Sequence, residues 1–397
     1  MQPFAPAVPR LSTDSTKARH EERRQDRYVV IDAARGLGIL GIGLCNAPGF
    51  AAPLSQAEQL PALASQMDRF LWVAEQTLMQ GRFVALFSLL FGLSMLWVGG
   101  DGHDPAASAR LTRRLRWLAA FGVLHGALLW WGDILLPYAL TGLILRPCRR
   151  WSARRLLTVG AVAYVTGVAL LRIDGLVALW SGGHIAGPVP RNTQVLSPSF
   201  LFLIKENAAD WFITLPQTLP SVMLASGPLM LIGMGLWRAD RFLPRATSPW
   251  NVWFLIGGIV AALVSLPLVL MQIGALPAYG GLHSADMAFL SVTVRLLVAP
   301  FGALGWLWIV AHTTKAQETL APVGRLALSA YLSQSLLARL CLLVAPGYYG
   351  GVPYAPLMTL AGLLVLLQAA GARLWCRRGW AGPAETVWRR LYRRASP

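Results

Sequence analysis

The sequence predicts an all-α protein, a polytopic bundle of about ten transmembrane helices with both termini in the cytoplasm. Three observations lead to this prediction. The 397 residues are 55% hydrophobic and 13% charged, with a mean hydropathy of +0.51, whereas roughly a quarter of the residues in soluble domains are charged. Apolar runs long enough to cross a bilayer recur along the chain. The basic residues gather beside alternate runs, which sets the orientation.

Ten apolar runs are expected to cross the membrane, because about 20 apolar residues span the hydrocarbon core. They cover residues 31–50, 83–100, 116–132, 134–147, 156–180, 212–237, 250–272, 288–312, 326–345 and 355–376. Most of the 35 Lys and Arg residues lie in the two tails and in alternate loops. Cytoplasmic loops carry such an excess of positive charge, so both termini are predicted to face the cytoplasm.

The runs divide the chain into a bundle and two tails. Residues 1–28 are polar, with Pro and mixed charge, and predict a disordered cytoplasmic tail without the apolar core of a cleavable signal. Residues 29–376 form the predicted bundle, and the basic, amphipathic residues 377–397 predict a cytoplasmic tail on anionic lipid. Residues 67–80 have an apolar and a polar helical face, so we expect a helix lying flat at the outer interface.

Charge and cysteine content exclude several functional classes. The net charge is +17, but the basic residues lie between apolar runs rather than on one soluble face, so nucleic acid is not a predicted partner. The four cysteines stand far apart without a Cys-x-x-Cys pair, which predicts neither a disulfide framework nor a zinc site. Walker and His-Glu-x-x-His motifs are absent from the sequence, so we predict no metal and no nucleotide hydrolysis.

The third and fourth runs are too short to cross a whole bilayer. At 1.5 Å per residue, residues 116–131 make about 24 Å of helix and residues 134–145 about 18 Å, against a hydrocarbon core of about 30 Å. The turn at Gly132 and Asp133 therefore stops short of the outer surface. A turn at that depth needs protein or water around its backbone groups, so Asp133 is predicted to face an aqueous pocket.

His125 lies deeper on the same hairpin. We expect it about 12 Å along the axis from Asp133 and about 80° round the helix, so that the two side chains need not touch. Imidazole titrates near neutral pH, so His125 is a candidate general base reached from the pocket. A histidine that only forms a hydrogen bond between packed helices remains an open alternative.

The first run carries a polar stripe. Asp32 and Arg35 are three residues apart and predict an ion pair at the inner end, while Asn46 lies eleven residues after Arg35 and within about 20° of the same helical face. Glycines remove side-chain bulk between these ends and permit either close helix packing or a narrow passage for a pantetheine-like arm. These are Gly36, Gly38, Gly41 and Gly43.

With these motifs, the chain resembles the YeiB family, whose C-terminal part is called domain of unknown function 418. The motifs are DAARG followed by Asn46, GRFVALFSLLFG at 81–92, LHGALLWWGDILLPYAL at 124–140, GRLALSAYLSQS at 324–335 and GPAETVWRRLY at 382–392. The resemblance covers nearly the whole chain from about residue 28. It implies a multi-pass protein of the bacterial cytoplasmic (inner) membrane.

The first run is also similar to that of the heparan-α-glucosaminide N-acetyltransferases, which have an Asp, then Arg-Gly, then an asparagine eleven residues after the arginine. These enzymes and the acyltransferase 3 family use cytoplasmic acyl-CoA to modify sugars on the far side of a membrane. The similarity implies acyl-CoA, expected to be acetyl-CoA, as co-substrate. The acyltransferase 3 proteins typically have histidine where this chain has Asn46, so we expect His125 to supply the base.

The leading hypothesis is a transmembrane acyltransferase that acts on a hydroxyl or amine acceptor. His125 would deprotonate the acceptor, Asn46 would donate a hydrogen bond to the thioester oxygen, and Asp133 would orient the acceptor or stabilise the imidazolium. Basic residues at the inner mouth would hold the CoA phosphates: Arg35, Arg113, Arg114, Arg116 and Arg325. Expected acceptor contacts in an outer pocket are Arg82, Trp131, Tyr138, Arg295 and Gln334.

Other readings stay open. Arg82, Arg172, Arg295 and Arg339 fall on the outer side, where they could line a wet cavity. The alternative for the arginines inside spans is that each snorkels to the interface or pairs with a structural acid such as Asp174. Buried polar groups also fit a proton-coupled transporter or exporter, and a non-catalytic receptor or assembly factor is a third hypothesis. The sequence leaves open the acceptor, the acyl chain length and the assembly, including a homodimer.

Overall fold

The computed structural model describes residues 13–52, 65–185, 199–243, 250–278, 282–345, 349 and 352–394, and within them all regular structure is helical. The predicted all-α fold is confirmed. The helices are α1 (Thr13–Ala51), α3 (Gln66–Leu78), α4 (Arg82–Gly99), α5 (Pro105–Leu128), α6 (Leu135–Leu145), η1 (Arg146–Arg150), α7 (Ala153–Leu171), α8 (Ile173–Trp180), α9 (Phe200–Arg238), α10 (Asn251–Gln272), α11 (Ser284–Ala311), α12 (Thr314–Arg325), α13 (Ala327–Val344), α14 (Tyr354–Arg377) and α15 (Pro383–Arg394).

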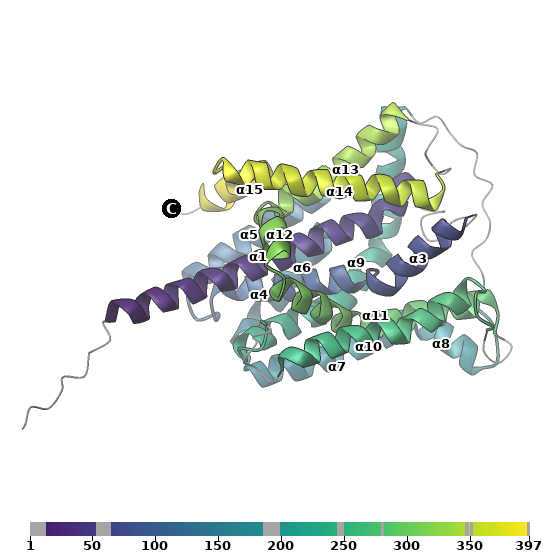
Figure 1. Cartoon of the computed structure of the whole chain (residues 1–397), viewed down its shortest axis with the longest axis horizontal. Coiled ribbons are helices and arrows are strands. Elements are labelled where there is room, and N and C mark those ends of the chain that lie inside the picture. Colours follow the sequence, from purple (N-terminus) through teal and green to yellow (C-terminus); the bar gives the residue numbers. More distant parts are fainter. Residues whose placement is uncertain are drawn as a thin grey trace, which may run out of the picture.

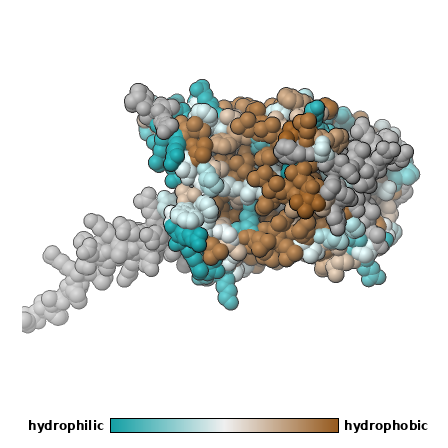
Figure 2. All heavy atoms as spheres, turned by 90° about the horizontal axis from the view of Figure 1, so that it is seen from above, coloured by the Kyte–Doolittle hydropathy of each residue, from teal (hydrophilic) through white to brown (hydrophobic). Residues whose placement is uncertain are grey.

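Most of the long helices run along one common direction (Figure 1). The start of α1 and all of α15 lie at one end of the bundle, which we call the terminal end, and α3 lies toward the opposite, far end. Figure 2 shows a broad apolar surface over the middle of one face, with hydrophilic residues gathered toward the terminal end. This is the surface expected of a multi-pass protein in a lipid bilayer. That the terminal end faces the cytoplasm stays a prediction.

Eight helical segments of the described chain are long and apolar enough to cross a membrane. They are Tyr28–Ala51, Gln66–Gly99, Ala153–Leu171, Leu201–Arg238, Asn251–Gln272, Ser284–Ala311, Ala327–Val344 and Tyr354–Arg377. The other two expected spans correspond to α5 and α6, the hairpin already predicted to be short, and α6 has only 11 residues. A break at Arg172 divides the expected span 156–180 into α7 and α8.

The glycines of the first run serve close helix packing. A Cβ added to Gly36 would overlap the Leu320 carbonyl group, and one added to Gly324 would overlap the Asp32 carbonyl group. The backbones of α1 and α12 are therefore in direct contact. The predicted ion pair is present beside this crossing, with Arg35 Nη1 2.8 Å from Asp32 Oδ1. α1 begins at Thr13, within the segment predicted as a disordered tail, while residues 1–12 lie outside the described residues.

Helix α3 turns its polar side chains inward. Asp68 and Glu75 are 2% and 4% exposed, whereas Phe70 is 67% exposed. Asp68 explains part of this orientation, because it closes a capping box with Ser65 and its Oδ1 also accepts the backbone N–H of Ala355 at 2.7 Å. One carboxylate thus holds the start of α3 and the start of α14 together. Whether α3 lies flat at the outer interface remains a prediction.

Candidate functional site

Three polar side chains meet inside the bundle and form the candidate active site. His125 Nδ1 lies 2.8 Å from Asp133 Oδ1, and His125 Nε2 lies 2.9 Å from Ser335 Oγ. All three residues are at most 2% exposed. When Asp133 is ionised, Nδ1 carries the proton, so Nε2 is free to accept the Ser335 hydroxyl proton. Ser335, His125 and Asp133 are therefore hydrogen-bonded in the same sequence as the nucleophile, the base and the orienting carboxylate of a catalytic triad.

The end of α5 explains the contact between His125 and Asp133. The helix stops at Leu128, and the N–H groups of Leu129 and Trp130 both bond the His125 carbonyl oxygen. The following turn reverses the chain, so Asp133 returns to the level of His125. The expected 12 Å separation is therefore wrong, because it assumed that the helix continues to Asp133.

Further contacts hold Asp133 and His125 in place, one at the start of α6 and the others from Tyr331 of α13. Asp133 Oδ2 accepts the Leu136 N–H at 2.9 Å, at the start of α6. From α13, the Tyr331 oxygen accepts the Ile134 N–H at 3.3 Å, and its ring centroid lies 4.9 Å from that of His125. Tyr331 precedes Ser335 by one helical turn, so α13 presents both side chains to the histidine.

A cavity of about 270 Å³, which we call the terminal cavity, leads from the terminal end toward this site. Its lining includes Arg35 of α1, Arg114 of α5, Arg325 of α12 and Arg389 of α15. Farther along, the same cavity is lined by apolar and aromatic side chains that include Phe87, Leu135, Tyr138 and Tyr331. Since Tyr331 also contacts His125, the cavity joins a cluster of arginines to the edge of the candidate active site.

Three of the five arginines predicted to hold CoA therefore share one cavity, namely Arg35, Arg114 and Arg325. Arg113 and Arg116 are not among its lining residues. Helix α15 supplies Arg389 and is held against the bundle by Glu385, whose Oε1 accepts the Leu328 N–H at 2.7 Å.

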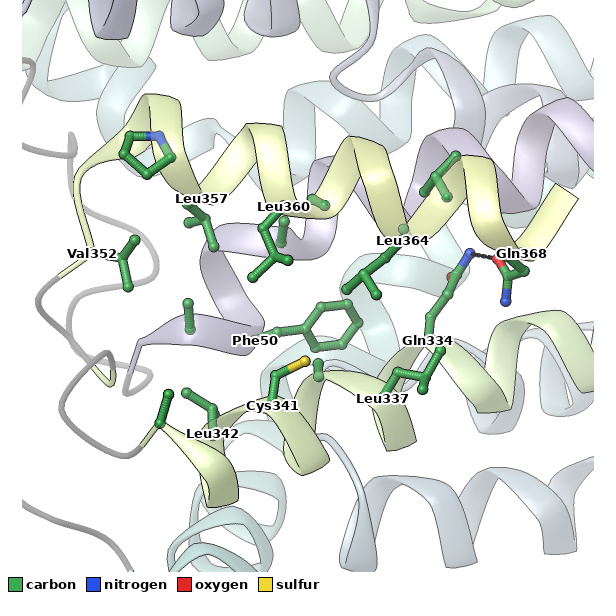
Figure 3. Close-up of a pocket in the computed structure, with 18 residues that line it drawn as sticks. Phe50, Gln334, Leu337, Cys341, Leu342, Val352, Leu357, Leu360, Leu364 and Gln368 are labelled. Atoms are coloured by element: carbon green, nitrogen blue, oxygen red, sulfur yellow. Dashed lines mark hydrogen bonds between the residues drawn. The ribbon is translucent and has the colours of Figure 1, made fainter. Parts of the chain in front are cut away.

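A second cavity of about 390 Å³, the far-end cavity, lies between α1, α13 and α14 (Figure 3). Most of its lining is apolar, from Phe50, Leu360 and Leu364 among others. At one end of the labelled side chains in Figure 3, Gln334 Nε2 bonds Gln368 Oε1 at 2.9 Å. Gln334 Oε1 is buried and has no hydrogen-bond partner.

Successive segments of α13 line the two cavities. Tyr331 lines the terminal cavity, and Gln334, three residues later, lines the far-end cavity. Ser335 follows directly and bonds His125. The far-end cavity extends to Ala51, the last residue of α1, and to Val352, just before α14. The residues next to the candidate active site thus line a basic cavity toward the terminal end and an apolar cavity toward the far end, while His125, Asp133 and Ser335 line neither.

The arginines expected to line one wet outer cavity line neither of the two cavities described above. Arg82 is 1% exposed and donates to Ser265 Oγ at 2.7 Å and to the Gln80 carbonyl at 2.9 Å. Arg295, 5% exposed, donates to Gln76 Oε1 and to the Ser291 carbonyl. These two predicted acceptor contacts connect α3, α4, α10 and α11, and neither lines the two cavities described above.

The remaining two arginines also have protein partners. Arg172 donates to Thr293 Oγ1 at 3.0 Å and stacks on the Phe289 ring. Arg339 donates to the Leu129 carbonyl at 2.7 Å and to Asn207 Oδ1 at 2.9 Å, so it holds the turn that follows α5. All four arginines thus have structural partners in the protein, but these are carbonyl, hydroxyl and amide oxygens rather than the acid that the alternative prediction named.

The chain has relatives along nearly its whole length. A family model described as a protein of unknown function, DUF418, matches residues 236–395. Uncharacterized protein YeiB of Escherichia coli (strain K12) is 29% identical over 94% of this chain and 97% of that protein. Uncharacterized protein YxaH of Bacillus subtilis (strain 168) is 26% identical over 92% of this chain and 94% of that protein. The predicted resemblance to the YeiB family is confirmed. No solved structure matches the chain.

The motifs shared with the YeiB family now have places in the fold. His125, Asp133 and Tyr138 all come from the motif LHGALLWWGDILLPYAL. Tyr138 is 1% exposed and lines the terminal cavity, and its hydroxyl oxygen lies 2.6 Å from Ser88 Oγ. GRLALSAYLSQS supplies Arg325, Tyr331, Gln334 and Ser335, and GPAETVWRRLY supplies Arg389. Three motifs that are distant in the sequence therefore build one site.

Asn46 and Trp131 were predicted as site residues, and the described structure shows neither of them bonded to His125. Both ring nitrogens of His125 are engaged by Asp133 and Ser335. Asn46 lines neither of the two cavities. The Trp131 ring packs against Trp130, whose Nε1 donates to the Gly49 carbonyl at 3.3 Å near the end of α1.

The sequence analysis missed Ser335 and Arg389 as site residues. Ser335 closes the motif that contains the predicted Gln334, but only the packing of α13 against α5 shows that its hydroxyl reaches His125. The basic amphipathic pattern of the C-terminal tail was assigned to the lipid surface. The aromatic residues Trp388 and Tyr392 beside Arg389 were the signal that this helix has a face for packing on protein.

Proposed function

We propose that the protein is an acyltransferase of the bacterial inner membrane. It would move an acyl group from cytoplasmic acyl-CoA, expected to be acetyl-CoA, to a hydroxyl or amine acceptor in a pocket open to the outer side. The observation that supports this most is the terminal cavity, which connects a cluster of arginines to Tyr331 beside the buried His125, Asp133 and Ser335. A thioester on a long phosphorylated arm requires a basic mouth, a narrow passage and a nucleophile with a base at its end.

The arginines at the mouth would bind the CoA phosphates. Four helices supply these arginines, which are Arg35, Arg114, Arg325 and Arg389. Glu385 is the one acidic residue of the cavity lining. Charge-assisted hydrogen bonds from guanidinium groups to phosphate are stronger than neutral ones and often bidentate. The apolar passage beyond them, lined by Phe87 and Leu135, suits the pantetheine arm and the acyl chain.

In the first chemical step, Ser335 Oγ attacks the thioester carbonyl carbon while His125 Nε2 takes the hydroxyl proton. Asp133 stabilises the imidazolium through Nδ1. The C–S bond then breaks, His125 returns the proton to the CoA thiolate, and the acyl group remains as an ester on Ser335. Ser335 does not itself line the terminal cavity, so Tyr331 must move aside as the thioester approaches. The Tyr331 hydroxyl can then donate to the developing oxyanion.

In the second step, the acceptor reaches the ester from the far-end cavity. His125 takes the proton of the acceptor hydroxyl or amine as that atom attacks the acyl carbon, and then gives the proton to Ser335 Oγ as the ester bond breaks. Gln334 Oε1, which lacks a partner, is available to accept a hydrogen bond from the acceptor. The enzyme returns to its starting protonation state, and the acyl group has crossed from one cavity to the other.

A proton-coupled transporter is the second candidate. The observation in its favour is that a buried, ionisable His125 and Asp133 pair stands between two cavities that extend toward opposite ends. A transporter would leave acyl-CoA intact and would move a solute in response to a pH gradient.

The test uses purified full-length protein in nanodiscs and radiolabelled acetyl-CoA. We expect label on the wild-type protein and release of free CoA, and we expect loss of both in Ser335→Ala and His125→Ala. Ser333→Ala is the matched control, because Ser333 is on the same helix but donates to the Ala330 carbonyl instead. Intact acetyl-CoA in the presence of a cell extract as acceptor source, together with proton-driven solute uptake in vesicles, would overturn the acyltransferase proposal in favour of the transporter.

A further inference from the structure

A second polar cluster lies far from the candidate active site in the sequence and joins two segments of chain. His184 follows α8, while His283 and Asp286 stand at the start of α11. His184 Nδ1 lies 2.7 Å from Asp286 Oδ2 and 2.8 Å from His283 Nδ1, and His283 Nδ1 lies 3.6 Å from Asp286 Oδ2. Three atoms that can bind a metal ion therefore converge on one point.

The surroundings hold this arrangement in place. Asp286 has a fully buried side chain, and its two oxygens accept the backbone N–H groups of Ile185 at 2.7 Å and His283 at 2.9 Å. The imidazole rings of His184 and His283 meet edge to face with centroids 3.9 Å apart. Their side chains are 50% and 65% exposed. A carboxylate oriented by backbone donors and two accessible imidazoles is the usual form of a metal site that keeps positions for water.

We propose that His184, His283 and Asp286 bind a divalent transition-metal ion of the Zn²⁺ class. Two imidazole nitrogens and one carboxylate oxygen suit Zn²⁺, whereas Mg²⁺ and Ca²⁺ prefer oxygen ligands alone. In a tetrahedral site with metal–ligand distances near 2.1 Å, ligand atoms stand about 3.4 Å apart. The two shorter pairs must therefore separate by several tenths of an ångström, which the half-exposed rings allow.

The ion would connect the chain after α8 to the start of α11. This role is independent of the proposed acyl transfer, since none of the three residues lines either cavity. The sequence analysis predicted no metal because it relied on ligands at short spacing. Here about a hundred residues separate His184 from the other two, so only the packing of α8 near α11 brings the set together.

The test measures Zn²⁺ binding by full-length protein that carries no polyhistidine tag and has been treated with a chelator. We expect one high-affinity site by isothermal titration calorimetry, and a visible absorption band of tetrahedral Co²⁺ when Co²⁺ replaces Zn²⁺. His184→Ala, His283→Ala and Asp286→Asn should each weaken Zn²⁺ binding more than about tenfold and remove the Co²⁺ band. His103→Ala, which removes an exposed histidine outside the cluster, should bind as the wild type does.

Folding is checked in the same samples by thermal unfolding. Because both imidazoles are half exposed, His184→Ala and His283→Ala should unfold near the metal-free wild type. Added Zn²⁺ should raise the unfolding temperature of the wild type and of His103→Ala, but not that of the three ligand variants. Equal Zn²⁺ affinity in wild type and both histidine variants would overturn the proposal. So would a site that binds Mg²⁺ as tightly as Zn²⁺.

Discussion

Two regions of the bundle bury charged or titratable side chains, and they differ in what surrounds these groups. His125, Asp133 and Ser335 line neither cavity, but Tyr331 beside His125 lines the terminal cavity and Gln334 beside Ser335 lines the far-end cavity. The Ser335 hydroxyl also faces a ring nitrogen of His125. Around Arg82 and Arg295, the described hydrogen-bond partners are carbonyl, hydroxyl and amide groups, and no residue that bonds these two guanidinium groups lines either cavity. Burial of a charge therefore does not by itself identify a reactive site; a neighbouring cavity and a side chain that can give up a proton are also needed.

The largest expected effect is on the chemistry of the histidine site. Ser335→Ala should lower the rate of CoA release from acetyl-CoA about 10⁴-fold, because the nucleophile and its base act as one unit. The same variant should lose only about 1–3 kcal/mol of unfolding free energy, the cost of leaving His125 Nε2 without a partner. Stopped assays of CoA release and denaturant titration measure the two quantities, and a rate within threefold of wild type would contradict the assignment.

The next largest effect is on stability at the arginine region. Arg295→Ala removes the donor to Gln76 Oε1 and one of the two cations near Glu75, the other being Arg82, and removing one member of such a buried charged group costs about 3–5 kcal/mol. Turnover per folded molecule should stay near wild type. The comparison would fail if this variant kept its unfolding temperature but lost acetyl-CoA turnover, because Arg295 would then act in the reaction.

A smaller effect is expected at the mouth of the terminal cavity. Arg389→Gln should raise the Michaelis constant for acetyl-CoA about tenfold or more with little change in turnover number, since one charge-assisted hydrogen bond contributes about 1.5–3 kcal/mol. Its neighbour Arg390 is absent from the cavity lining, so Arg390→Gln is the matched control. Equal Michaelis constants in the two variants would remove α15 from the proposed CoA site.

The smallest effect separates the two half-reactions. Gln334→Leu removes the side-chain oxygen that has no hydrogen-bond partner. The rate of acyl transfer to the acceptor should fall about threefold to tenfold, because one neutral hydrogen bond contributes about 0.5–1.5 kcal/mol. Acyl labelling in the absence of acceptor should not change. If labelling slowed by the same factor as transfer, Gln334 would belong to the donor side of the site.

Much of the fold follows from composition and charge, because the cost of exposing backbone groups to lipid leaves helices as the available structure for apolar runs of this length. The ion pair of Asp32 with Arg35 and the close packing at Gly36 also follow, since both depend on local spacing along one helix. The shortness of the hairpin 116–145 was predictable for the same reason.

The site was predictable only in part. His125, Asp133, Tyr138, Arg35, Arg114 and Arg325 were recognised as candidates, and the structure places them at the site or in the terminal cavity. The contact of His125 with Asp133 depends on where α5 ends, and helix ends are weakly encoded in a uniformly apolar sequence. Ser335 and Arg389 come to the site through tertiary packing of α13 and α15, for which one sequence contains no spacing rule.

The most direct test of the central claim is peptide mass spectrometry of the wild-type protein after incubation with acetyl-CoA and no acceptor. The account predicts one added acetyl group on the peptide that contains Ser335, with Ser335 as the modified residue, and no such adduct in His125→Ala. An unmodified Ser335 peptide together with fully intact acetyl-CoA would contradict it.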